Sequence, residues 1–238
     1  VNYVLTGATT GRGLIDASGI FFNQGVTTVT YTITDLSGNT SSCNFTITVN
    51  DTEPPALNCP ANSNVYVDGS CNFTIPDYRG AISGLADNCT PTGSIVITQL
   101  PTIGAIVSGA VTSQVITIYA ADASGNIDSC LFSINLIDTI KPIISCPGNI
   151  NVSSDLGSCG AIVNGISPTI FNDNCSIDSV SYTMFGATNT SGLNDASGVF
   201  FYKGTTNVTY MITDVSGNIE ICGFSVIVAD NEAPTITC

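Results

Sequence analysis

Histidine and tryptophan are absent from this 238-residue sequence, which has only four basic residues against 18 acidic ones. The net charge of −14 leaves almost nothing to neutralise phosphates, so we expect no nucleic-acid binding and no attraction to anionic membranes. Without histidine, and with carboxylates confined to turns and joints, no nucleophile and base can be paired, so we expect no catalytic residue and no enzymatic activity. Small cations are the partners that this charge favours.

Long apolar runs are missing as well. The sequence has no stretch of about 18 apolar residues and no signal peptide, so we expect no direct membrane insertion and an interior piece of a longer protein. No window shows a sustained period of 3.6 residues, which predicts almost no helix. Short β-branched runs between Gly, Asn, Asp and Pro instead predict an all-β protein.

One pattern organises the chain, and its clearest copy is GTTNVTYMITDVSGNIEICGFSVIVAD at 204–230. Apolar residues alternate in both halves, which predicts two strands with one buried face each. The D-V-S-G-N segment between them supplies a carboxylate that accepts backbone N–H bonds and a Gly-Asn pair that tolerates positive φ, which is typical of a turn. The same hairpin recurs at 25–51 and 113–138, so the chain is an array of repeats.

Proline-containing joints divide the array at DTEPPALNCP, DTIKPIISCP and DNEAPTITC, which begin at residues 51, 138 and 230. Residues 1–50 align without a gap onto 180–229, so they are expected to be the C-terminal half of a domain. Complete domains are predicted at 51–137 and 138–229, with the start of another at 230–238. Their size favours tandem immunoglobulin or fibronectin III-like β-sandwiches, and the stiff joints favour an extended rod.

Ten cysteines recur at similar spacings, which favours disulfides in an oxidising, extracellular setting. A zinc site is not expected, because there are no close cysteine pairs and no histidines. Four cysteines in a domain allow three pairings, and spacing does not choose among them. The cysteines are Cys43, Cys59, Cys71, Cys89, Cys130, Cys146, Cys159, Cys175, Cys222 and Cys238.

The motifs together resemble the hyalin repeat (HYR) domain. They are C-P at Cys59 and Cys146, D-N-C at 87–89 and 173–175, the three D-x-S-G-N turns, and the C-x-F motif that closes each hairpin. The resemblance implies an immunoglobulin or fibronectin III-like sandwich used in extracellular adhesion. The four-cysteine form, rich in Thr, Asn and Gly, resembles repeats of very large surface adhesins of gliding bacteria.

The resemblance also implies the disulfide pairing, because many hyalin repeats keep only the C-P and C-x-F cysteines. These two are then partners, as Cys59–Cys130 and Cys146–Cys222. Cys71–Cys89 and Cys159–Cys175 are the remaining pairs. Cys43 and Cys238 are expected to pair outside this segment.

Acidic residues gather at the joints and loops, where oxygen ligands from neighbouring domains could meet around a calcium ion. The alternative is that these aspartates only cap turns by accepting backbone N–H bonds. The candidate ligands are Asp51, Glu53, Asp87, Asp122, Asp138, Asp173, Asp214 and Asp230, with Glu232 beside the last.

Two further features have competing interpretations. Thr139 and Ser179 follow aspartate and precede an aliphatic residue, a pattern of bacterial O-glycosylation that also occurs by chance. Adjacent aromatics should place one ring inward and the other outward, for packing or for ligand contact. They are Phe21, Phe22, Phe200, Phe201 and Tyr202. We expect Phe45, Phe132 and Phe224 each to lie in the core of its own sandwich.

These observations favour a structural and adhesive repeat segment, a stalk or filament, of a large extracellular cell-surface adhesin used in surface adhesion or gliding motility. Its first partners are neighbouring repeats of the same chain. One alternative is an ectodomain that binds surface glycans or proteins with calcium, which a glycan array with and without chelator would reveal. Another is an accessory module of a secreted enzyme, which the full-length gene would reveal.

Overall fold

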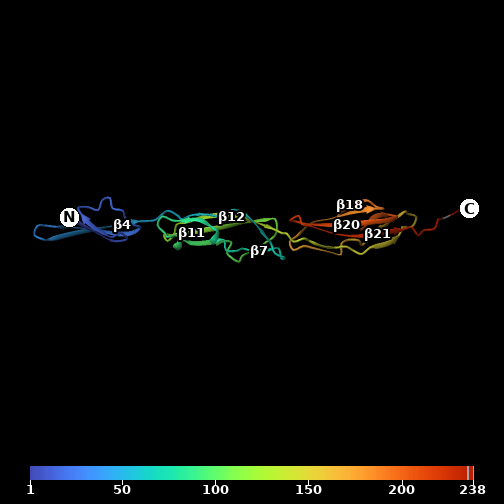
Figure 1. The fold of residues 1–238 in the computed structure, drawn as a ribbon, viewed down its shortest axis with the longest axis horizontal. Coiled ribbons are helices and arrows are strands. Elements are labelled where there is room, and N and C mark those ends of the chain that lie inside the picture. The colour runs from blue at the N-terminus through green and yellow to red at the C-terminus, as the bar shows by residue number, and fades with distance from the viewer. Residues whose placement is uncertain (235, 238) are drawn as a thin grey trace. The chain divides into compact units, whose positions relative to one another are not determined.

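The computed structural model describes residues 1–234, 236 and 237 of this all-β protein (Figure 1). Its described part has no α-helix, and two 3-10 turns interrupt the strands, η1 (Arg79–Ala81) and η2 (Thr92–Ser94). No helix there is long and apolar enough to cross a membrane. The chain forms two compact units: 1–60, 77–101 and 116–132 make up the first, and 61–76, 102–115 and 133–238 the second.

The first unit begins with one antiparallel sheet in the order β2-β1-β3-β4. Its core is small, with Leu5, Ala17 and Val29 buried. The prediction that Phe45 lies in the core is wrong: its side chain stacks on Tyr31 but remains 48% exposed, because no second layer covers this sheet among the described residues. The strands are β1 (Asn2–Gly7), β2 (Gly11–Leu14), β3 (Gly25–Thr34) and β4 (Thr40–Val49).

The rest of the first unit holds two further pairings. Strand β5 (Ala56–Asn58) pairs with β8 (Ser83–Ala86), and β9 (Val96–Leu100) pairs with the second half of β11 (Thr112–Ala121). Phe132 is buried, as predicted, and packs edge-on against the ring of Tyr78. It lies on β12 (Ile127–Ile137), whose end belongs to the second unit.

In the second unit, β6 (Ser63–Tyr66) runs parallel to the end of β12, and β7 (Asn72–Thr74) pairs with β10 (Ile106–Ser108). Its C-terminal part is a sandwich. A five-stranded sheet, β14-β21-β20-β17-β18, is accompanied by the pairs β15-β19 and β13-β16. The strands are β13 (Ile143–Ser145), β14 (Ile150–Ser153), β15 (Gly160–Val163), β16 (Ile170–Asn172), β17 (Ile177–Gly186), β18 (Thr190–Leu193), β19 (Val199–Tyr202), β20 (Gly204–Asp214) and β21 (Ile219–Ala229).

The core of this sandwich lies between the large sheet and the β15-β19 pair, as in an immunoglobulin-like fold. Val208 and Tyr210 of β20 are fully buried, and Phe224 of β21 is buried as predicted. The adjacent rings of β19 divide as expected, with Phe201 fully buried and Phe200 37% exposed. In the first unit, Phe21 is 84% exposed, while Phe22 packs against the core.

All three predicted hairpins are present, as β3-β4, β11-β12 and β20-β21 (Figure 1). The glycine of each D-x-S-G-N turn has positive φ, for example +87° at Gly217, where a Cβ would strain the backbone. The aspartate that begins each turn accepts the N–H groups of the serine and asparagine that follow it. This local chemistry fixes where Asp122 and Asp214 point.

Tyr210 also offers a test of what stabilises the sandwich. Its hydroxyl donates to the carbonyl oxygen of Ile166 at 3.0 Å and accepts the N–H of Ala196 at 2.9 Å. Since Tyr210→Phe leaves both groups unpaired in the core, it should lower the free energy of unfolding by about 1–3 kcal/mol in urea titrations at pH 7. The control is Tyr202→Phe, at a 57% exposed side chain. Equal losses in the two variants would contradict the role of this hydroxyl.

The same variant has a predicted pH dependence. Burial raises the pKa of Tyr210 to about 12, above its ordinary value near 10. The folded state therefore favours the neutral hydroxyl. The contribution of this hydroxyl to the free energy of unfolding is complete below pH 10 and is lost as the pH rises to 12. The difference in stability between wild type and Tyr210→Phe should narrow across this range.

Candidate metal centres and disulfides

Three aspartates of the second unit converge at one point. Asp138 follows β12, Asp173 follows β16, and Asp214 ends β20, so each leaves the end of a strand. Each supplies a carboxylate oxygen, and these oxygens all lie within 4.8 Å of one another. Asp138 and Asp214 are each only 2% exposed. Buried carboxylates this close repel one another unless a proton or a cation compensates them.

Each of these aspartates caps its own loop. Asp138 Oδ1 accepts the N–H of Ile140 at 2.9 Å, and Asp173 Oδ2 accepts the N–H groups of Cys175 and Ser176 at 2.9 and 3.1 Å. The other oxygens, Asp138 Oδ2 and Asp173 Oδ1, are buried without a hydrogen-bond partner. In Asp138 and Asp173, capping therefore accounts for one carboxylate oxygen and leaves the other free to bind a cation.

Asn218 braces this cluster, although sequence analysis assigned it no role. Its side-chain amide donates to Asp214 Oδ2 at 2.8 Å and to the carbonyl oxygen of Asp138 at 3.1 Å. Asn218 is the last residue of the D-x-S-G-N turn, and the recurrence of this asparagine in all three turns is the sequence signal that indicates its role. This brace ties the turn to the joint that precedes the repeat.

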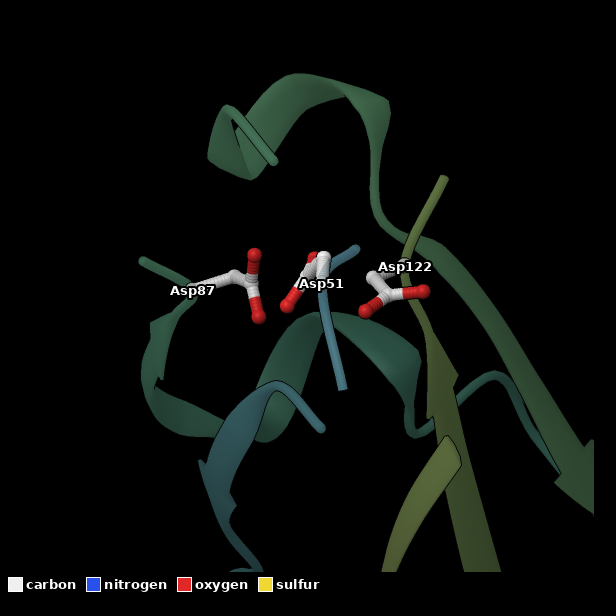
Figure 2. Close-up of side chains that lie close together, drawn as sticks. All are labelled: Asp51, Asp87 and Asp122. Atoms are coloured by element: carbon white, nitrogen blue, oxygen red, sulfur yellow. The ribbon is translucent and has the colours of Figure 1, made fainter. Parts of the chain in front are cut away.

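The first unit builds the same arrangement from Asp51, Asp87 and Asp122, whose ligand oxygens also lie within 4.8 Å of one another. Figure 2 shows the carboxylate of Asp51 between those of the other two. Asp87 Oδ2 accepts the N–H of Cys89 at 2.9 Å, and Asp87 Oδ1 is buried without a partner. Asn126 bonds to Asp122 Oδ2 at 2.7 Å and to the carbonyl oxygen of Asp51 at 3.3 Å.

The electrostatics of the clusters favour a hard cation. Burial raises the pKa of Asp122, but hydrogen bonds from Asn126, Ser124 and Gly125 outweigh it, so this pKa lies below its usual value and the carboxylate is charged at neutral pH. The ion pairs of the described residues join Asp77, Glu220 and Asp230 to basic side chains, and none includes a cluster carboxylate.

Calcium fits the donor set. It binds carboxylate oxygens at about 2.3–2.6 Å, so two of its ligands can be up to about 5 Å apart. The 4.8 Å limit on the oxygen separations lies within that span. Three carboxylates are fewer than the six to eight oxygens that calcium takes, so other oxygens, including water, would complete the shell.

The structure places the other predicted residues outside these clusters. Glu53 accepts a bond from the side chain of Asn88 at 2.8 Å, and Asp230 pairs with Lys203 at 3.1 Å. Glu232 accepts the N–H of Gly157 at 2.9 Å. The proposed glycosylation residues Thr139 and Ser179 are both exposed, and their modification stays a prediction.

Three disulfides are present among the described residues. Cys59 joins Cys130 and Cys146 joins Cys222, which are the two pairs that the family resemblance implies. The third joins Cys71 to Cys175, while Cys43, Cys89 and Cys159 are exposed free thiols. Burial raises the pKa of the Cys89 thiol, and the charges of the cluster aspartates raise it further. Cys238 lies outside the described residues.

The expected pairs Cys71–Cys89 and Cys159–Cys175 are therefore wrong. In the C-terminal repeat, Cys175 lies two residues after Asp173, and Asp173 belongs to the cluster at the joint before the repeat. Cys159 belongs to a loop bonded to Glu232, in the joint after the repeat. A disulfide needs Cα atoms within about 7 Å, and Cys175 meets this condition with Cys71, at a Cα separation of 4.9 Å.

The fold and these sites define a class of protein: disulfide-stabilised, immunoglobulin-like β-sandwich repeats with carboxylate clusters at their joints. The model of the HYR domain matches residues 14–49 and 137–228, and the chain belongs to the HYR domain family. The resemblance to HYR repeats is thus confirmed. Family membership and the disulfides fit an extracellular location.

Among curated proteins, the chain is similar to hyalin of Strongylocentrotus purpuratus, with 34% identity over 93% of this chain and 18% of that protein. It is also similar to hyalin of Lytechinus variegatus, with 32% identity over 63% of this chain and 28% of that protein. The chain thus spans less than a third of either hyalin.

Solved structures that match the chain include the human CDH23 EC21–23 fragment, at 14% identity and a TM-score of 0.40, covering 85% of this chain and 74% of that one. The fibronectin(III)-like modules of Clostridium thermocellum CbhA match at 14% identity and a TM-score of 0.31, covering 77% of this chain and all of that one.

Proposed function

We propose that this chain is a structural and adhesive segment of a large extracellular cell-surface adhesin, in which calcium bound at each joint stiffens the connection between neighbouring repeats. The observation that carries the proposal is the buried, unpartnered Oδ2 of Asp138, a residue whose carboxylate lies in a cluster with two further carboxylates. Calcium would supply charge compensation and link loops that come from separate strands. Asp138, Asp173 and Asp214 would hold one ion, and Asp51, Asp87 and Asp122 another.

Membership of the HYR family supports the adhesive role. The Thr-, Asn- and Gly-rich repeats with four cysteines resemble those of adhesins of gliding bacteria, which supports a stalk or filament that serves surface adhesion or gliding motility. A glycan array probed with and without a chelator would test whether the segment itself binds a surface ligand. Binding that the chelator abolishes would favour direct adhesion, whereas no binding would favour a spacer.

Calorimetric titration with calcium tests the metal sites directly. We expect the wild-type chain to bind at two sites. Asp173→Asn should lose one of them and the double variant Asp87→Asn/Asp173→Asn both, because asparagine can keep the loop caps while replacing the free oxygen with an N–H donor. Absence of binding to the wild-type chain, or two intact sites in the double variant, would contradict the proposal.

The matched control is Asp68→Asn. Asp68 Oδ1 caps a loop by accepting the N–H groups of Ser70 and Asn72, as the cluster aspartates cap theirs. Its side chain is exposed and belongs to neither cluster. This variant should therefore retain both calcium sites.

A further inference from the structure

The Cys71–Cys175 disulfide joins two different sequence repeats. Cys71 lies in the D-G-S-C loop of the repeat at 51–137, and Cys175 lies in the D-N-C loop of the repeat at 138–229. The side-chain amide of Asn174 adds a hydrogen bond to the carbonyl oxygen of Asp68 at 3.2 Å. The loop cysteine of one repeat thus forms a disulfide with the D-N-C cysteine of the next.

Cys159 occupies the position of Cys71 in the following repeat. The N–H of Asp68 bonds to Asn72 O and that of Asp155 to Gly160 O, both at 2.8 Å, so the two loops close in the same way. The carbonyl oxygen of each cysteine accepts a backbone N–H from the neighbouring segment, at 3.0 Å for Cys71 and 2.9 Å for Cys159.

Cys89 occupies the position of Cys175. Both follow D-N, and both donate their N–H to the aspartate two residues earlier, at 2.9 Å. Cys89 and Cys159 are exposed free thiols, whereas their counterparts form the bridge. Among the described cysteines there is therefore one complete inter-repeat bridge, and two further cysteines occupy the positions of its two halves.

The surroundings of Cys159 already contain the joint of a following repeat. Gly157, Ser158 and Cys159 line an open hollow together with Asp230 and residues 232–234. Asp230 aligns with Asp51 and Asp138, each of which meets the D-N-C aspartate of its own repeat. A repeat built on Asp230 would consequently bring its D-N-C loop to this hollow.

We propose that Cys159 forms a disulfide with the D-N-C cysteine of a following HYR repeat and that Cys89 forms one with the loop cysteine of a preceding repeat. The two Sγ atoms bond and both S–H bonds break. Two electrons and two protons pass to a disulfide oxidant such as oxidised glutathione, which is reduced to two thiols. This inference does not depend on calcium binding.

The test adds one repeat to the full chain by placing a second copy of residues 147–229 after residue 238, because 230–238 already supply the joint. After folding with oxidised glutathione, peptide mapping without reductant should find Cys159 joined to the copied Cys175. Cys159 should react with iodoacetamide in the 238-residue chain and be protected in the extended one. A copied Cys175 that is free, or joined to its own copied Cys159, while Cys71–Cys175 forms would overturn the proposal.

A variant of the 238-residue chain tests whether a D-N-C cysteine pairs only with the loop cysteine of the preceding repeat. In Cys71→Ser, Cys175 should become a free thiol that iodoacetamide modifies, because its partner position lies in the preceding repeat. Formation of Cys159–Cys175 would show that the pairing can close within one repeat, and would overturn the proposal.

Discussion

The variant Asp173→Asn should be at least as stable as the wild-type protein in a chelator, and about 1.4–2.7 kcal/mol less stable than wild type in about 10 mM calcium. In the chelator, the new amide would relieve the repulsion among three carboxylates and could donate to the unpartnered Oδ2 of Asp138. In calcium, the wild type gains the free energy of binding at dissociation constants of about 0.1–1 mM, typical of extracellular calcium modules. Thermal unfolding of both proteins in chelator and in calcium measures whether the stability difference between the variant and the wild type changes sign.

Asp68→Asn is again the control, because its aspartate caps a loop outside the clusters. Its unfolding temperature should rise with calcium as much as that of the wild type. The metal sites are refuted if calcium stabilises neither the wild type nor Asp68→Asn. They are also refuted if calcium stabilises Asp173→Asn as much as the wild type, because the aspartates then act only as caps.

Removal of the Cys146–Cys222 disulfide should cost about 2–4 kcal/mol of unfolding free energy. This bridge closes a separation of 76 residues and packs against the core of the C-terminal sandwich. The double variant Cys146→Ser/Cys222→Ser raises the conformational entropy of the unfolded chain, because the cross-link is gone. It also removes two sulfurs from the edge of that core. Urea unfolding without reductant, followed through the C-terminal sandwich, measures the loss.

Cys159→Ser is the control for this experiment, because it replaces an exposed, unbridged thiol. Its effect should stay within about 0.5 kcal/mol, as for most surface substitutions. Reductant should lower the stability of the wild type more than that of the double variant. Equal stability of the wild type with and without reductant would mean that packing alone holds the sandwich together.

Part of the candidate site could be predicted because its chemistry is local. Asp122 and Asp214 begin turns whose sequence specifies the cap, and six of the eight predicted metal ligands belong to the two clusters. Their grouping could not be predicted, because each cluster takes one residue from a joint and two from loops far away in sequence. Glu53 and Asp230 lie at the joints too, but their side chains have other partners.

The amino-acid sequence by itself determined the all-β class, the three hairpins and the repeats, because alternation along a strand and turn chemistry act over a few residues. The tertiary structure alone decided that Cys71 pairs with Cys175 and that Phe45 stays exposed. A disulfide depends on which loops reach the same joint, and the burial of a ring depends on whether a second layer covers it. Both are set by packing between segments far apart in sequence, where the local pattern carries no information.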